Sequence, residues 1–227
     1  MPAGVFCVSF LIPTPFNSII DIICLLTIAF SLATVFCTAK IYASLKTIRQ
    51  WNHLLVVPVY LIIGLFDGAI FLMVLLTIID GLQFFQLNYF IIFLGAVAGL
   101  AKILYWWSID STQSQSNTST ATGLGSSNKS VSMLDAPTTS ETFIMREMGF
   151  AIARKHSRRL RLITILTLSI IPIIIIFLMT QPIALVSPMV LGIIAILFSY
   201  FGTIIERWLF FAEAKHVAML YYGASKV

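Results

Sequence analysis

The sequence predicts an all-α, polytopic bundle of about five transmembrane helices with a disordered polar loop. Hydrophobic residues make up 59% of the 227 residues and charged residues 10%, whereas a typical soluble domain is about half apolar and about a quarter charged. Several apolar runs reach the roughly 20 residues that a helix needs to cross a bilayer. Most lysines and arginines occur in a few clusters between these runs. We therefore expect residues 1–227 to form a single membrane domain surrounded by lipid.

The expected helices follow one another along the chain, separated by turns or by one longer polar segment. Two of them contain glycine pairs at a spacing of four, Gly64 with Gly68 and Gly95 with Gly99. Small residues at this spacing let helix backbones approach closely in lipid, so we expect the second and third helices to pack against each other or against a partner. Pro172 should bend the fourth helix. The predicted ranges are 19–39, 54–79, 87–107, 160–180 and 189–211.

The chain between the third and fourth helices changes character abruptly. Residues 111–140 are dominated by Ser, Thr, Asn, Gln and Gly, a composition that cannot bury enough apolar surface to fold alone. We interpret this stretch as a flexible, disordered loop. Residues 141–159 combine an apolar helical face with a basic cluster, which predicts an amphipathic helix at the membrane surface.

The distribution of basic residues predicts the orientation. All fourteen lysines and arginines fall on one side of the predicted helices. The connections on the other side, 80–86 and 181–188, contain none. Because basic residues are retained in the cytoplasm, the C-terminus and the 109–159 loop are predicted to be cytoplasmic, and residue 1 is predicted to lie outside.

Asp67 lies near the midpoint of the second predicted helix. An aspartate at the centre of a membrane helix costs roughly 2.5–3.5 kcal/mol on insertion scales. Such residues are usually functional, and one hypothesis is that Asp67 is a proton relay. The alternative is a protonated carboxyl group that is hydrogen-bonded to a neighbouring helix.

The end of the last helix is rich in polar side chains. Three of these side chains, Glu206, Glu213 and His216, are separated by seven and three residues, which places them on one helical face. Phe210 lies between them and Arg207 alongside. Two carboxylates and an imidazole beside aromatic rings can bind a polar ring head group and move protons. The alternative is an interfacial helix end whose charged groups extend into water.

Other patterns limit the chemistry. Trp106 and Trp107 end the third predicted helix on the same side of the membrane as Glu206, Glu213 and His216. Aromatic residues are common at a membrane interface, and such rings can also form the wall of a quinone pocket. The three cysteines show no CxxC spacing, and the three histidines lie on different elements. We therefore predict no haem, iron–sulfur cluster or metal site in this chain, no catalytic constellation and no nucleic-acid partner.

Four segments carry a recognisable set of motifs: IYASLKTIRQW (41–51), TATGLG (120–125), EMGFAIARKHSRRLR (147–161) and ERWLFFAEAKHVAMLYYG (206–223). Together they resemble the membrane anchor subunit of dimethyl sulfoxide reductase. That resemblance implies a subunit that holds an iron–sulfur electron-transfer subunit and a molybdopterin catalytic subunit on the bacterial inner membrane. It also implies oxidation of menaquinol, with no haem in the anchor itself.

The chain departs from the pattern of that family in one respect. The family's N-terminal portion, about three of its eight or so helices, has no counterpart here. The sequence leaves open whether this chain is a fragment or a shortened paralogue. Of the motif positions present, the resemblance marks His216 as quinol-adjacent and adds Glu206, Arg207 and Glu213 to a candidate quinol site. Two other functions remain open: a small transporter or channel-like protein that uses Asp67, and a non-redox assembly subunit.

Overall fold

The computed structural model describes residues 17–80, 85–112, 117–123, 131, 134–135, 151–181 and 186–222. Within them, five helices are long and apolar enough to cross a membrane, so the all-α polytopic fold is confirmed. The fourth span consists of α8, a π-helical turn η1 and α9. The elements of the spans are α2 (Asn17–Ala43), α3 (Val56–Asp80), α4 (Phe85–Ser111), α8 (Ser157–Ile165), η1 (Leu166–Ile170), α9 (Ile171–Met179) and α10 (Pro188–Ala212).

The helices agree with the predicted ranges except at the ends nearest the basic residues. The third span continues to Ser111, and the fourth begins at Ser157. Arg158 and Arg159, which we assigned to the surface segment 141–159, therefore belong to the first turn of a spanning helix. Of that segment, α7 (Ala151–Lys155) is described, whereas residues 141–150 lie outside the described residues.

The loop predicted over 111–140 contains one short helix, α5 (Thr118–Thr122). Polar side chains support it locally, since Thr122 Oγ1 donates to the Thr118 carbonyl at 2.7 Å. It packs against η2 (Val217–Tyr222), the 3₁₀ helix near the C-terminus. The prediction of a structureless loop is therefore wrong for this turn, which tertiary contact with η2 supports.

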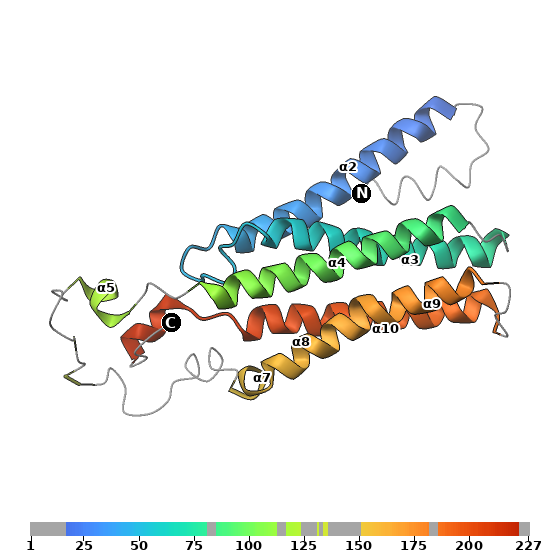
Figure 1. The fold of residues 1–227 in the computed structure, drawn as a ribbon. Helices are drawn as coiled ribbons and strands as arrows, with labels where there is room; N and C mark the ends of the chain where they lie inside the picture. The colour runs from blue at the N-terminus through green and yellow to red at the C-terminus, as the bar shows by residue number, and fades with distance from the viewer. Residues whose placement is uncertain are drawn as a thin grey trace.

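Four spans form a packed bundle, and α2 leans against one side of it (Figure 1). The bundle consists of α3, α4, the α8–η1–α9 span and α10, and α2 packs against α3. Only 6% of the α2 span is buried, compared with 44% of the fourth span. Figure 1 shows α2 diverging from the other helices toward its N-terminal end. Most side chains of α2 are therefore exposed in this chain.

The glycine pair of α4 lies at a close helix contact. A Cβ on Gly95 would lie 2.7 Å from the Phe66 ring of α3 and 2.9 Å from Ile173 of α9. Ser169 in η1 donates to the Gly95 carbonyl at 2.7 Å. The predicted packing of the second helix on the third is confirmed. In α3, a Cβ on Gly64 would lie 3.9 Å from Val35 of α2 and a Cβ on Gly68 would have no neighbour within 4 Å, so the α3 pair does not lie at the contact with α4, and its packing against a partner stays a prediction.

The interruption of the fourth span lies at the predicted place. Pro172 lies two residues after the last residue of the π-helical turn η1. Proline has no N–H to donate to the preceding turn, and π-helical turns are a recognised cause of helix irregularity. The irregularity presents Thr167, Leu168 and Ser169 to the interior of the bundle, where all three are buried.

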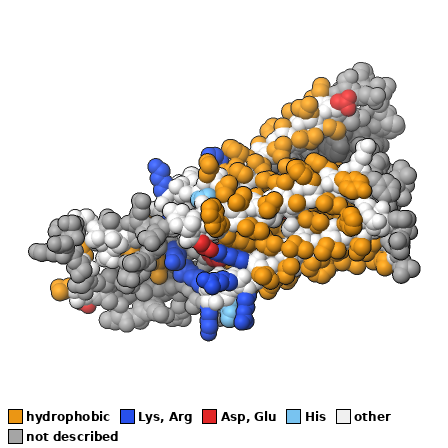
Figure 2. Space-filling view, in the orientation of Figure 1, with side chains coloured by type: hydrophobic (Ala, Val, Ile, Leu, Met, Phe, Trp, Pro, Cys, Tyr) orange, Lys and Arg blue, Asp and Glu red, His pale blue; other side chains and the backbone are white. Residues whose placement is uncertain are grey.

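Charge gathers at one end of this bundle. Hydrophobic side chains cover the long middle of the visible face, and Lys and Arg side chains cluster at the end where α7 lies (Figures 1 and 2). We call this the basic end. The α2–α3 loop, the C-terminal end of α4, the start of α8 and the end of α10 meet there. Which side of a membrane the basic end faces stays a prediction.

Candidate functional site

A buried ionic cluster joins α4 to α10. Lys102 and Glu206 are 1% and 0% exposed. Lys102 Nζ donates to one carboxylate oxygen of Glu206, and Arg207 Nε donates to the other. The Glu206 carboxylate thus binds two cations in a low-dielectric interior, where an unpaired charge is strongly disfavoured.

Lys102 lies well inside α4 rather than at its end. Because α4 continues to Ser111, Lys102 lies about 14 Å inside that end at 1.5 Å per residue. Its ammonium group is 4.3 Å from the ring centroid of Tyr105 and 4.9 Å from that of Trp106. Trp106 is accordingly buried rather than interfacial, whereas Trp107 is exposed, as an interfacial residue would be.

Arg207 has an unsatisfied donor. The centre of its guanidinium lies 3.6 Å from the Tyr60 ring centroid and 5.4 Å from that of Phe210. Its Nη1 atom is buried and has no hydrogen-bond partner in the described part of the chain. Buried donors are normally satisfied, and an exception calls for an explanation such as a ligand or water.

Aromatic rings from four elements gather next to Arg207. Tyr42 of α2 lies 5.4 Å from Phe210 of α10, and Trp51 of the α2–α3 loop stacks on Phe210 at 5.7 Å. Trp51 Nε1 donates to the Phe210 carbonyl at 2.9 Å. Tyr60 and Phe211 complete what we call the aromatic cluster. Tyr42 lies near the C-terminal end of α2, the opposite end from the one at which α2 diverges from the bundle (Figure 1).

Asp67 is held by the neighbouring helix α10. It accepts hydrogen bonds from Ser199 Oγ and from Thr203 Oγ1, the latter at 2.8 Å. This geometry matches the alternative to a proton relay, in which the carboxyl group of Asp67 is hydrogen-bonded to a neighbouring helix. Ser199, Thr203 and Glu206 follow at spacings of four and three, so they form one polar face of α10 that runs from Asp67 toward the basic end. A proton-relay role stays a prediction.

The stripe predicted from Glu206 to His216 does not form, because α10 ends first. Ala212 is its last residue and Glu213 its C-cap. His216 instead pairs with Ile48 in an isolated β-bridge, and the N–H of Val217 donates to the Thr47 carbonyl at 3.1 Å. The expectation that His216 shares a helical face with Glu206 is therefore wrong.

A side chain from a distant segment caps the end of α10. Arg154 of α7 donates to the Ala212 carbonyl at 3.1 Å and to the Ala214 carbonyl at 2.8 Å. These carbonyls have no partners within the helix, and a cation also stabilises the negative end of the helix dipole. The sequence could not indicate this cap, since Arg154 lies 58 residues before Ala212 in the chain.

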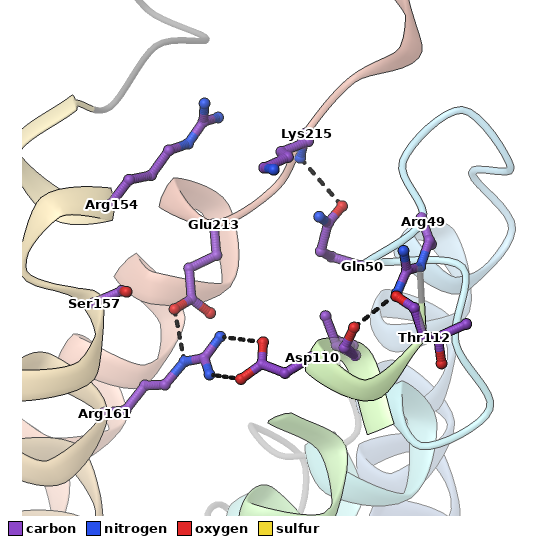
Figure 3. A pocket seen from close by; sticks show the side chains of 10 residues that line it. Arg49, Gln50, Asp110, Thr112, Arg154, Ser157, Arg161, Glu213 and Lys215 are labelled. Carbon is purple, nitrogen blue, oxygen red and sulfur yellow. Dashed lines mark hydrogen bonds and ion pairs between the residues drawn. The ribbon is translucent and has the colours of Figure 1, made fainter. Parts of the chain in front are cut away.

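Glu213 lines a pocket of about 410 Å³ at the basic end (Figure 3). Arg161 lies between two carboxylates: its Nε donates to Glu213 at 2.7 Å, and its two terminal nitrogens bind Asp110. Arg49 donates to the carbonyls of Ile109 and Thr112 at the C-terminal end of α4. The four residues of the predicted quinol site are thus divided: Glu206 and Arg207 are in the ionic cluster, Glu213 is in this pocket, and His216 is on the loop beyond.

His53 joins the start of α3 to the end of α4. Its Nδ1 accepts from the Leu55 N–H at 3.2 Å, and its Nε2 lies 2.9 Å from Ser108 Oγ. Burial, and secondarily the nearby Arg49, lower the pKa of the His53 imidazole. The neutral ring that this pattern requires is thereby favoured. A histidine with a lowered pKa contributes stability above its ordinary pKa, and this contribution is lost as the pH falls through the lowered value.

The fold and its buried charges define a multi-pass helical membrane protein with an ionic site between its helices. The chain is 31% identical over 193 residues to a subunit of the sulfite dehydrogenase of Allochromatium vinosum. The aligned region is 85% of this chain and 57% of the relative, so the chain spans little more than half of the relative's length. No family model matches the sequence, and no solved structure matches it. The similarity is to a redox-complex subunit, and the narrower resemblance to a dimethyl sulfoxide reductase anchor stays a proposal.

Proposed function

We propose that this chain is the membrane subunit of a respiratory oxidoreductase complex, which passes electrons from menaquinol to partner subunits. Its similarity to a dehydrogenase subunit and its five spans support this assignment. Following the sequence resemblance, the partners are an iron–sulfur electron-transfer subunit and a molybdopterin catalytic subunit. The membrane is the bacterial inner membrane, with the basic end and the C-terminus in the cytoplasm.

The observation that carries the quinol assignment is the unsatisfied donor of Arg207 beside the aromatic cluster. A buried donor without a partner costs about 1–3 kcal/mol. A quinol hydroxyl or a quinone carbonyl can accept from Nη1 while the ring packs against Tyr60 and Phe210. Most large apolar side chains of α2 are exposed, so we expect lipid next to the cluster, and an isoprenoid tail can remain in the bilayer.

Oxidation of the quinol breaks its two O–H bonds and yields the quinone, two electrons and two protons. In the proposed reaction the electrons go to the iron–sulfur subunit. Glu206 is bonded to Arg207 and is the carboxylate next to the proposed ring position. Asp67 and the hydroxyls of Ser199 and Thr203 continue the polar face from there, and they can hold or relay a proton. Glu213 and His216 lie toward the basic end, where protons would reach water.

Replacing Arg207 by glutamine should slow quinol oxidation by about 10- to 100-fold, because a hydrogen bond to a charged donor contributes about 1.5–3 kcal/mol. The measurement is the rate of menaquinol-analogue oxidation by membranes that contain the complex, normalised to co-purified partner subunits. His216→Ala is a second variant, for which we also expect a lower rate with assembly intact.

Arg159→Gln is the matched control for Arg207→Gln, since Arg159 is an exposed arginine of the same end. It should oxidise quinol at the wild-type rate. A wild-type rate in the fully assembled Arg207→Gln complex would remove the quinol from this position.

Asp67→Asn separates the redox subunit from a small transporter or channel-like protein and from a non-redox assembly subunit. As a proton relay, Asp67 should be needed for fast quinol oxidation, so the variant should lose most of that rate at unchanged assembly. In a transporter the same variant would abolish ion flux into liposomes and leave quinol oxidation unchanged. In a purely structural subunit neither rate would change. The two rates, measured on the same preparations, distinguish these outcomes.

A further inference from the structure

The pocket at the basic end lies where five segments converge. It is lined from the α2–α3 loop, the end of α4, α7, the start of α8 and the residues after α10. The candidate spans end or begin at Ala43, Val56, Ser111, Ser157 and Ala212. The pocket therefore lies at the boundary between the apolar belt and water, at the level of lipid head groups. Its volume of about 410 Å³ falls within the roughly 300–1,000 Å³ of small-molecule sites.

The charges of the pocket favour an anion. Its lining holds the cations Arg49, Arg154, Arg161 and Lys215 and the carboxylates Asp110 and Glu213. Both carboxylates are bound by Arg161. Arg49 donates from Nη2 to two neutral carbonyls, which leave its charge unneutralised. Lys215 adds a further positive charge at the rim. The lining thus carries more positive charge than its two carboxylates neutralise.

The neighbouring surface extends this positive field. A second pocket of about 510 Å³ shares Arg154 and Ser157 with the first, and the rest of its lining is Lys155, His156, Arg158 and Arg159. Its lining contains no acidic side chain among the described residues. Ser157 also begins α8, whose first N–H groups and helix dipole favour a bound anion.

We infer that the pocket of Arg49, Arg154 and Lys215 binds a phosphate group. The planar guanidinium groups match phosphate oxygens in pairs, and basic pockets between transmembrane helices at the cytoplasmic side bind anionic lipid head groups. The phosphate can belong to an anionic phospholipid, whose acyl chains enter the adjacent apolar belt, or can be free phosphate. The phosphate site does not depend on the proposed ring position at Arg207; the pocket shares only Glu213, on the proposed proton path, with the predicted quinol site.

The test uses the full chain purified in detergent. Native mass spectrometry counts bound phosphatidylglycerol or cardiolipin against phosphatidylcholine, and thermal unfolding compares phosphate with chloride at equal ionic strength. Anionic lipid should be retained preferentially, and Lys215→Gln should weaken its binding about fivefold, as expected for one basic residue near an anionic surface. Arg49→Gln should weaken it likewise. Lys46→Gln removes one exposed charge from the same loop region and outside the pocket lining, and should bind as the wild type does.

The two arms distinguish the source of the phosphate group. Preferential retention of anionic lipid identifies a phospholipid site, whereas stabilisation by phosphate without lipid preference identifies a free-phosphate site. Either result supports the inference if Lys215→Gln reduces the lipid preference or the stabilisation by phosphate and Lys46→Gln does not. Equal binding of anionic and zwitterionic lipid with no phosphate effect, or equal effects of the two lysine variants, overturns it.

Discussion

Replacing Glu206 by glutamine should destabilise the bundle by roughly 3–5 kcal/mol, because removing one partner of a buried ion pair leaves an uncompensated charge. Lys102 is 1% exposed and would lose its carboxylate while remaining among apolar and aromatic side chains. At a size of about 150–250 residues this corresponds to a fall in Tm on the order of 10 °C. The measurement is thermal or denaturant unfolding of the purified protein in detergent.

A double variant shows whether unpaired charge is the cause. Glu206→Gln combined with Lys102→Met removes both charges of the pair and should recover much of the lost stability, since a buried ion pair can often be replaced by apolar groups of similar volume. Asp110→Asn is the surface control, because the Asp110 carboxylate is 59% exposed and exposed pairs contribute about 0–1 kcal/mol. Equal losses in the Glu206 variant and the Asp110 variant would contradict the argument.

Replacing Gly202 by alanine should disrupt the contact between α10 and the π-helical turn. A Cβ at this position would lie 2.6 Å from the Cα of Leu168 and closer still to its backbone nitrogen. Backbone atoms cannot move aside as a flexible side chain can, so the helices must separate. Overpacking of this kind costs about 1–3 kcal/mol and sometimes more. We expect a lower Tm and a lower yield of monodisperse protein.

Gly68→Ala is the matched control for Gly202→Ala. A Cβ on Gly68 has no neighbour within 4 Å, and alanine has the higher helix propensity by about 1 kcal/mol. This variant should be as stable as the wild type or slightly more stable. If both alanine variants unfold at the wild-type temperature, the close approach of α10 to Leu168 is not a constraint on the fold.

The number, order and approximate limits of the spans could be predicted from the sequence because each is a local property. A helix in lipid must satisfy its backbone hydrogen bonds internally and must be apolar over about 20 residues. Five runs meet that requirement without reference to one another. The clustering of lysines and arginines at one end of the bundle is likewise visible in the linear order, and Figure 2 shows the same asymmetry in space.

The functional arrangement depends on contacts between distant residues, so only the tertiary structure could decide it. Lys102 meets Glu206 across 104 positions of the chain, and Ser199 meets Asp67 across 132. The local sequence places Lys102 within the third predicted helix, but it does not indicate that Glu206 is its partner, because that pairing results from the packing of the helices.

The end of α10 shows the same difference between what a local sequence pattern indicates and what distant contacts decide. Glu206, Glu213 and His216 have a helical spacing, and from the sequence alone they share a face. The capping of Ala212 by Arg154 and the pairing of His216 with Ile48 turn the chain away before that face is complete. The sequence by itself determined which segments enter lipid and which end collects positive charge, since both follow from local composition. Which charges pair inside the bundle, and which residues face the pocket, was decided by how the helices pack.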